Sequence, residues 1–295
     1  MSDIKEGTIV GRSSYNCDLV FRVKRIEGET AILYGEDMRL IADAPLSDLV
    51  FIEEAERKKR AEHEKQKEES CYQLFRQERK LIREKSEFEV TSGYTKKNDY
   101  FEVPGRVLHI DGDSLYLKKC TQVYDKLGVP VYGVHLQEKE MPLQIGSLIE
   151  MIRPDILVIT GHDAYMKNKG TKQDMKAYRN SKHFVEAVKE ARKVVPYMDH
   201  LVIFAGACQS HFQSILKAGA NFASSPDRIN IHALDPVYVV SKVSLTPFME
   251  RVGVWDVLKV SLTGEKGLGG IETTGSLRRG MPHFHFKEEE DDDEE

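Results

Sequence analysis

The chain has 295 residues, of which 40% are hydrophobic and 31% charged, and its formal net charge is −5. This length and composition predict a soluble globular protein with one full domain and a smaller one. Apolar runs stay well below the ~20 residues that span a membrane. A secretory signal and a basic stripe with interleaved aromatic residues are both missing, so we expect a cytoplasmic protein with neither membrane nor nucleic-acid partners.

Residues 6–50 alternate between short β-prone runs and turns, as in "LVFRVKRI" (19–26) followed by "TAILYG" (30–35). This pattern predicts the strands of a small sheet. Because so short a segment is near the lower limit for independent folding, we expect residues 1–50 to form a small SH3-like β-barrel that leans on its neighbour. Its role is either to bind a partner or substrate, or to support the structure.

The composition changes abruptly after residue 50. Residues 53–88 are rich in Glu, Lys, Arg and Gln, which favour a helix and form many i,i+4 pairs of opposite charge. Apolar positions are too sparse for a coiled-coil seam. We therefore predict a charged helical linker over residues 51–100.

From residue 101 the pattern alternates between apolar runs and amphipathic stretches. Continuous runs of Val, Ile and Leu are typical of parallel strands that are covered on both faces, and helices between them give a doubly wound, Rossmann-like α/β fold. We assign residues 101–286 to this domain, and the acidic residues 287–295 to a disordered tail. The apolar runs are "GRVLHIDGD" (105–113), "VPVYGVHL" (129–136), "DILVIT" (155–160) and "HLVIFAGA" (200–207).

Two of these strands end beside residues that can move protons or act as nucleophiles. Gly161 and His162 follow the third strand, and Gly206 and Cys208 follow the fourth. In an open α/β sheet, ligands bind beyond the carboxyl ends of the strands, so neighbouring strands would present His162 and Cys208 at one edge. A glycine before each allows a sharp turn.

A cysteine and a histidine at this edge could carry out acyl transfer. A helix N-terminus, expected near Ser210, would lower the pKa of the Cys208 thiol. A histidine can protonate a leaving amine and deprotonate the attacking water, and backbone N–H groups, including that of Cys208, can stabilise an oxyanion. The simplest such reaction is hydrolysis of a peptide through a thioester.

Other interpretations of the same cysteine stay open. Cys208 could be a small buried hydrophobic residue. His211 lies close to it along the expected helix, and His232 follows another apolar run. His232 in place of His162 would give the order found in glutamine amidotransferases.

Metal and phosphate sites have weaker support. Asp111 and Asp113 sit at a strand end, where they could hold magnesium or form a turn. The glycine-rich residues 264–275 lack the order of a phosphate-binding loop and predict a mobile loop. The four cysteines show no paired spacing, and the histidines of "HFH" (283–285) stand beside an acidic run. We predict no cofactor, no bound metal and no disulfide framework.

A strand followed by His and, about 50 residues later, a strand followed by Ala-Cys resembles the caspase-like cysteine peptidases. The stretch "GACQS" (206–210) corresponds to the signature around their cysteine. Caspases carry glycine directly after the catalytic histidine, where this chain has Asp163. The resemblance implies a caspase-like sheet, and we take Gly161, Asp163, Gly206 and Gln209 as candidates for the oxyanion site and pocket.

Segments along nearly the whole chain are similar to the YabG family of sporulation-specific proteases. This resemblance implies a cysteine endopeptidase of the mother cell that acts on spore coat and morphogenetic proteins, cleaves after Arg or Lys, and processes itself. It also implies that Cys208 and His162 are catalytic. The similar segments are "RLIADAPLSDLV", "VLHIDGD", "RPDILVITGHDAY", "YRNSKHFVE", "LVIFAGACQSHF", "AGANFASSP", "NIHALDPVYVV", "TPFMER" and "EKGLGGIETTG".

Cleavage after a basic residue requires a carboxylate in the pocket, because a desolvated guanidinium needs a bidentate partner. Asp163 and Asp235 are the candidates by position. Residues 277–280, "LRRG", are the expected site of self-cleavage.

Two functions stay open beside the peptidase. One is a cysteine-dependent amidotransferase or hydrolase that uses Cys208 and His232. The other is a non-enzymatic scaffold for coat assembly, which would bind partners through the N-terminal strands and the charged helix. The sequence does not indicate the oligomeric state.

Overall fold

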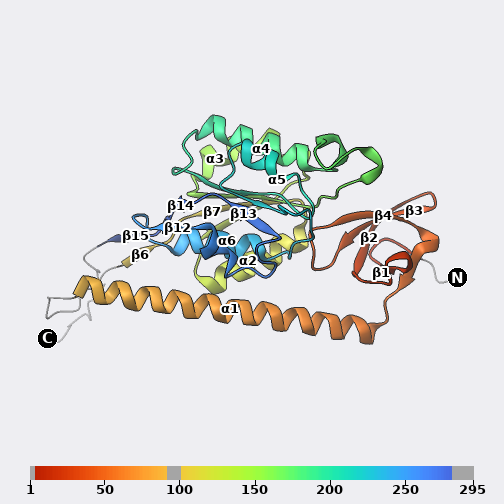
Figure 1. Ribbon diagram of the computed structural model, residues 1–295, viewed down its shortest axis with the longest axis horizontal. Helices are drawn as coiled ribbons and strands as arrows, with labels where there is room; N and C mark the ends of the chain where they lie inside the picture. The colour runs from red at the N-terminus through yellow and green to blue at the C-terminus, as the bar shows by residue number, and fades with distance from the viewer. Residues whose placement is uncertain (1–3, 92–100, 281–295) are drawn as a thin grey trace, which may run out of the picture.

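The computed structural model describes residues 4–91 and 101–280, with two main β-sheets joined by one long helix (Figure 1). The acidic tail 287–295 and the histidines of residues 283–285 lie outside the described residues. Within the described part of the chain, none of the helices is long and apolar enough to cross a bilayer.

The N-terminal strands form an open, antiparallel sheet. Their order is β4-β3-β2-β1-β5, so β4 and β5 are edge strands, whereas a closed barrel has no edges. In β3 every second residue is buried, as expected for a strand with one face on a core. The strands are β1 (Ile9–Arg12), β2 (Phe21–Glu27), β3 (Thr30–Gly35), β4 (Ile41–Pro45) and β5 (Leu49–Phe51).

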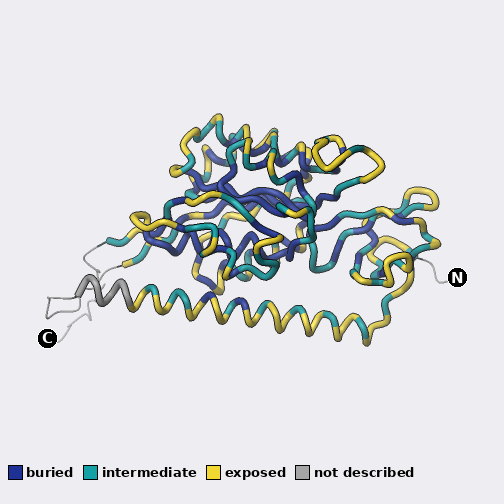
Figure 2. Tube along the Cα trace, viewed as in Figure 1, coloured by how far each residue is buried: buried dark blue, intermediate teal, exposed yellow. Residues whose placement is uncertain are grey.

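A single helix, α1 (Glu54–Thr91), covers the charged stretch and runs along both sheets (Figure 1). Its surface is mostly exposed (Figure 2), and i,i+4 ion pairs such as Lys58–Glu54 lie on it. Two buried residues anchor it to the C-terminal part: the Cys71 thiol donates to the Val260 carbonyl at 3.0 Å, and Phe75 packs in the same core.

The second sheet is mainly parallel and confirms the predicted α/β class. Its order is β13-β11-β10-β9-β7-β8, and only β13 runs antiparallel to its neighbour. Strands β7 and β9 are buried along their whole length, which explains their continuous apolar sequence. The strands are β7 (Val107–Asp111), β8 (Val131–His135), β9 (Ile156–Thr160), β10 (Val202–Ala205), β11 (Phe222–Ser224) and β13 (Leu268–Gly270).

Helices cover both faces of this sheet (Figure 1). On one face lie α3 (Met141–Ile152), α4 (Ser181–Val194) and the short α5 (Phe212–Lys217), which share one hydrophobic core. On the other lie α2 (Ser114–Leu127), α6 (Asp235–Leu245) and α7 (Val254–Leu258), which share a second core with α1. The sheet is thus the dark, buried layer at the centre of Figure 2.

The prediction of a mobile loop over the glycine-rich residues 264–275 is wrong. This stretch contains β13 at the sheet edge and β14 (Thr273–Thr274), which pairs with β12 (Arg251–Val252). A Cβ at Gly270 would lie 2.3 Å from the Asn221 carbonyl oxygen, so glycine here permits close approach of two strands. The remaining strands, β6 (Phe101–Val103) and β15 (Arg278–Gly280), pair with each other.

Candidate active site

The carboxyl ends of four parallel strands gather ionisable side chains at one edge of the sheet. Asp111 ends β7, Glu138 follows β8, His162 follows β9 and Cys208 follows β10. All four are buried, and Asp111, His162 and Cys208 have no exposed surface. This edge is where an open α/β sheet places its ligands.

The Cys208 side chain lies against the segment after β11. Its sulfur accepts a hydrogen bond from the Ile231 N–H at 3.2 Å. Burial raises the pKa of the Cys208 thiol, so the predicted lowering by a helix N-terminus is wrong. Helix α5 begins only at Phe212 and is short, and the desolvation of the thiol outweighs the helix dipole in this closed arrangement.

The His162 ring lies between two tyrosine rings, with centroids 3.8 Å from Tyr34 and 5.4 Å from Tyr116. Its Nε2 is 3.6 Å from Asp113 Oδ2, and its Nδ1 is 4.0 Å from Glu138 Oε1. Neither ring nitrogen has a hydrogen-bond partner among the described residues. Burial lowers the pKa of His162 to about 4, so the imidazole is neutral and free to accept a proton.

The loop between β3 and β4 reaches into this edge and places one carbonyl group between the two strand ends. The carbonyl oxygen of Arg39 accepts hydrogen bonds from the Cys208 N–H at 3.1 Å and from the Asp163 N–H at 3.4 Å. Asp163 directly follows His162, and the other N–H group is that of Cys208 itself, so the backbone at both candidate catalytic residues meets the same peptide group. Two N–H groups that converge on one carbonyl oxygen have the geometry of an oxyanion hole.

The Arg39 side chain is fully buried below this carbonyl group. Its Nη1 lies 2.7 Å from Asp111 Oδ2, and its Nε and Nη2 donate to the Ala233 carbonyl at 3.2 and 3.0 Å. Burial alone would raise the pKa of Asp111, but Arg39 and His109 beside it hold this pKa well below its ordinary value. The edge therefore contains a closed, negatively charged subsite that fits a guanidinium.

Comparison with known proteins identifies the family. A family model described as YabG peptidase U57 matches residues 5–282. The chain belongs to this family. The sporulation-specific protease YabG of Bacillus subtilis (strain 168) is 57% identical over 282 residues, which cover 94% of this chain and 97% of the relative. No solved structure matches the chain. The chain is therefore a peptide hydrolase, and the predicted resemblance to the YabG family is confirmed.

In this YabG-family chain the two carboxylates that were predicted for the basic-residue pocket bond to groups other than the Arg39 guanidinium. Asp163 accepts hydrogen bonds from Ser181, Ser210 and two backbone N–H groups, and Asp235 accepts from Thr263 and its neighbours. These carboxylate oxygens hydrogen-bond to neighbouring loops, whereas the carboxylate that binds the Arg39 guanidinium is that of Asp111.

Gln209 and the glycines have more local roles. The Gln209 side chain bonds to the Tyr165 N–H and to Asn230, beside the candidate nucleophile. Gly206 has φ +113°, as the expected turn requires. Gly161 serves a different purpose, because a Cβ there would lie 2.5 Å from Glu138 Oε1.

The alternative histidines have other partners. His211 Nδ1 accepts from the Ser214 N–H at the start of α5, and its Nε2 lies 3.2 Å from the Gln173 carbonyl oxygen. His232 Nδ1 accepts from the Leu234 N–H, and its Nε2 is 3.4 Å from Glu68 on α1. Both side chains thus make contacts typical of structural histidines.

The magnesium hypothesis finds no support at this edge. Asp113 Oδ1 accepts from two N–H groups at the start of α2, a helix cap. Donor atoms of His109, Asp111 and Cys120 lie within 4.8 Å of one another, as in a metal site. The Arg39 guanidinium, however, occupies the space beside them, with Nη2 3.4 Å from the Cys120 sulfur.

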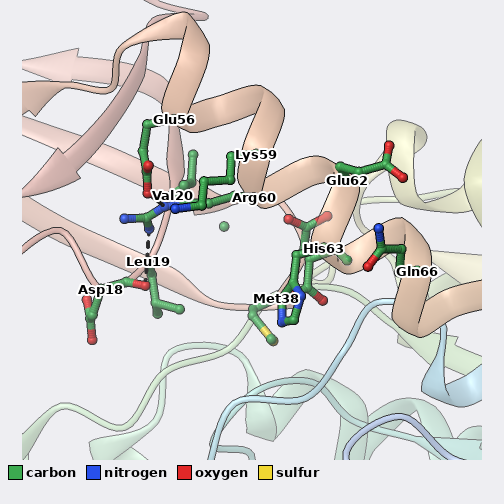
Figure 3. Close-up of a pocket in the computed structure, with 13 residues that line it drawn as sticks. Asp18, Leu19, Val20, Met38, Glu56, Lys59, Arg60, Glu62, His63 and Gln66 are labelled. Carbon is green, nitrogen blue, oxygen red and sulfur yellow. Dashed lines mark hydrogen bonds and ion pairs between the residues drawn. The ribbon is translucent and has the colours of Figure 1, made fainter.

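Two hollows flank the site. One, of about 950 Å³, opens beside Leu40 and is lined by Ala164 and Gln209, the neighbours of the candidate dyad. The other, of about 720 Å³, lies behind the loop and is lined by Gly35, Met38 and residues of helix α1; Figure 3 shows Met38 beside this helix. The hollow beside Leu40 could accept the part of a peptide substrate that follows the hydrolysed bond.

Glu138 was missed in the sequence, since it stands in a loop without a motif. Its Oε1 accepts the His162 backbone N–H at 2.8 Å and fits against Gly112 and Gly161. Burial raises the pKa of Glu138 from 4.5 to about 7, so this carboxyl group binds its proton more tightly in the folded chain than in the unfolded chain.

The stability of the chain should therefore depend on the charge of Glu138. Its contribution is fully present below pH 4.5 and is lost as the pH rises through about 7. Between these limits the wild type should lose up to about 3 kcal/mol relative to Glu138→Gln, which stays neutral. Thermal unfolding of both proteins at about pH 5 and about pH 8 measures this difference. A difference that does not change with pH would contradict the assignment.

Proposed function

We propose that the chain is a cysteine endopeptidase that cleaves spore coat and morphogenetic proteins after Arg or Lys in the mother cell. One observation carries this proposal: the N–H groups of Cys208 and Asp163 converge on a single peptide carbonyl oxygen. Cys208 and His162, which carry the thiol and the imidazole, follow adjacent strands, β10 and β9. The name of the Bacillus subtilis relative supports a role in sporulation.

The reaction follows from the groups at this carbonyl. The Cys208 sulfur adds to the carbonyl carbon while its proton passes to His162, and the two N–H groups stabilise the oxyanion. His162 then protonates the leaving amine, and it deprotonates the water that hydrolyses the thioester. Asp113, near Nε2 of the ring, stabilises the imidazolium while it exists.

The preference for arginine is assigned to Asp111 rather than to Asp163 or Asp235. Asp111 is buried and already bonds to a guanidinium, that of Arg39. A planar guanidinium fits such a site better than an ammonium ion, because it donates to the carboxylate and to the Ala233 carbonyl at once. We therefore expect Arg to be preferred over Lys.

Mass-spectrometric mapping of the cuts in a mixture of coat proteins tests this proposal. The wild type should produce new termini after Arg, and Cys208→Ala should reduce their rate by about 10⁴-fold or more. Cys71→Ser, at a buried cysteine of helix α1, is the matched control and should cut as the wild type does. Equal cutting by Cys208→Ala and the wild type would refute the cysteine mechanism.

A further inference from the structure

We propose that the Arg39–Leu40 peptide bond of the chain itself is the first substrate of this site, held there by the loop between β3 and β4 and cut within the same molecule. This inference rests on the proposed function and names the bond, the mode of binding and the consequence of the cut.

The loop is held by isolated β-bridges to two segments beyond the ends of the strands, and main-chain contacts of this kind hold extended peptides on many proteins. Met38 pairs with His232 in an antiparallel bridge, and Leu40 pairs with Asp163 in a parallel one. The Arg39 N–H donates to the Ile231 carbonyl at 3.4 Å, and the Ile41 N–H donates to the Asp163 carbonyl at 3.3 Å. Main-chain contacts thus hold the loop on both sides of one peptide group.

The register of these contacts selects one bond. The carbonyl oxygen between the Cys208 and Asp163 N–H groups belongs to Arg39, so the bond that follows it is Arg39–Leu40. The Arg39 side chain enters the Asp111 subsite, the position that the proposed preference requires. Leu40 then lies at the opening of the hollow of about 950 Å³, where the leaving side of a substrate would lie.

The reaction balances without any further reagent except water. The Cys208 sulfur forms a thioester with the Arg39 carbonyl carbon, and the bond from that carbon to the Leu40 nitrogen breaks. The thiol proton passes through His162 to the Leu40 nitrogen, which becomes a new amino terminus. Water then hydrolyses the thioester, which releases the Arg39 carboxylate and restores the thiol.

The cut should open the site without dismantling the fold. Strand β3 stays paired with β4, and β1 stays paired with β5, across the break. Residues 36–39 become a free end, which the Tyr116 hydroxyl contacts at the Met38 carbonyl (2.9 Å) and the Asp111 carboxylate contacts at the Arg39 guanidinium (2.7 Å) until the end moves away. The hollow between Met38 and α1 (Figure 3) leaves space behind the loop into which this end can move.

Incubation of the purified full-length chain tests the inference by intact mass and N-terminal sequencing. We expect the first cut to give two fragments, 1–39 and 40–295, that elute together until denatured. The fraction of the chain that is cut per unit time should not change on about tenfold dilution, since the step is intramolecular. Cys208→Ala should stay intact, and Arg39→Gln should be cut at least about 100-fold more slowly because it lacks the cation for Asp111.

Two controls separate folding from cutting. Arg251→Gln alters an exposed arginine of β12, whose Nη1 lies 3.4 Å from Glu272 Oε1, and should be cut at the wild-type rate. Arg39→Lys keeps the cation and should be cut more slowly than the wild type but faster than Arg39→Gln. If the lysine and glutamine variants, both folded by circular dichroism, are cut as fast as the wild type, the inference is wrong.

A reporter peptide that contains arginine distinguishes failure of this inference from failure of the proposed function. We expect the wild type to cleave this peptide only after a lag. The rate of peptide cleavage should then rise in step with the amount of the 40–295 fragment. Cleavage from the start by a chain that stays intact would overturn the inference and leave the peptidase standing. If neither the peptide nor the chain is cut, both proposals fail.

Discussion

Asp111→Asn, compared in a Cys208→Ala background that prevents cutting, is expected to lower the free energy of unfolding by about 3–5 kcal/mol. The substitution keeps the shape of the side chain and removes the charge that compensates the Arg39 guanidinium. That guanidinium has no exposed surface, and its Nη1 lies 2.7 Å from the carboxylate. Removing one partner of a buried ion pair leaves the other charge desolvated and unpaired.

Urea-induced unfolding of the variants measures this loss. Glu27→Gln breaks an exposed ion pair with Arg25 within strand β2 of the N-terminal sheet and should cost less than about 1 kcal/mol. The double variant Arg39→Met/Asp111→Asn should lose less stability than the sum of its single variants, because the two residues are coupled. A loss for Asp111→Asn no larger than that for Glu27→Gln would mean that the buried pair does not form.

Much of the α/β sheet could be predicted from the sequence, because its central strands are continuous apolar runs. The apolar runs at residues 105–113, 129–136, 155–160 and 200–207 contain β7, β8, β9 and β10. Strand β11 escaped because it has only three residues, and β13 because two of its three residues are glycine. Short strands of this kind form through contacts with their neighbours and carry little periodicity of their own.

The candidate site could be predicted only in part. The residues that follow the strands, His162 and Cys208, stand in a pattern that the strand-end rule detects. Asp111 was noticed for the same reason, but its partner, Arg39, comes from a loop in the other sheet. Contacts between segments so far apart in the chain leave no local signal, so the sequence left Asp111 with a turn or a weakly supported magnesium site and did not indicate the guanidinium that it binds.

The raised pKa of the Cys208 thiol could likewise not be predicted from the sequence. A helix that follows a strand end predicts a lowered thiol pKa, and that prediction treats the edge as open to solvent. The loop that carries Arg39 covers this edge. Burial of the thiol then raises its pKa more than a helix N-terminus would lower it. The sequence thus describes the open edge of the sheet, whereas the structure shows it covered.

Covalent labelling by a peptide chloromethyl ketone that ends in arginine tests the peptidase site most directly. The guanidinium should enter the Asp111 subsite, and the ketone oxygen should meet the two N–H groups that contact Arg39. The Cys208 sulfur then displaces chloride and forms a stable thioether. His162→Ala should slow this labelling by about 10²–10⁴-fold, because the thiol loses its proton acceptor and the uncut loop keeps Arg39 in the Asp111 subsite.

The decisive result is the position of the adduct in the incubated wild-type chain, read by peptide mapping. We expect one label, on Cys208, with Cys17, Cys71 and Cys120 unmodified. His183→Ala, at a histidine on α4 beside Glu186, should label at the wild-type rate. An adduct at another residue, or equal rates for the wild type and His162→Ala, would contradict the assignment of Cys208 and His162 as the catalytic pair.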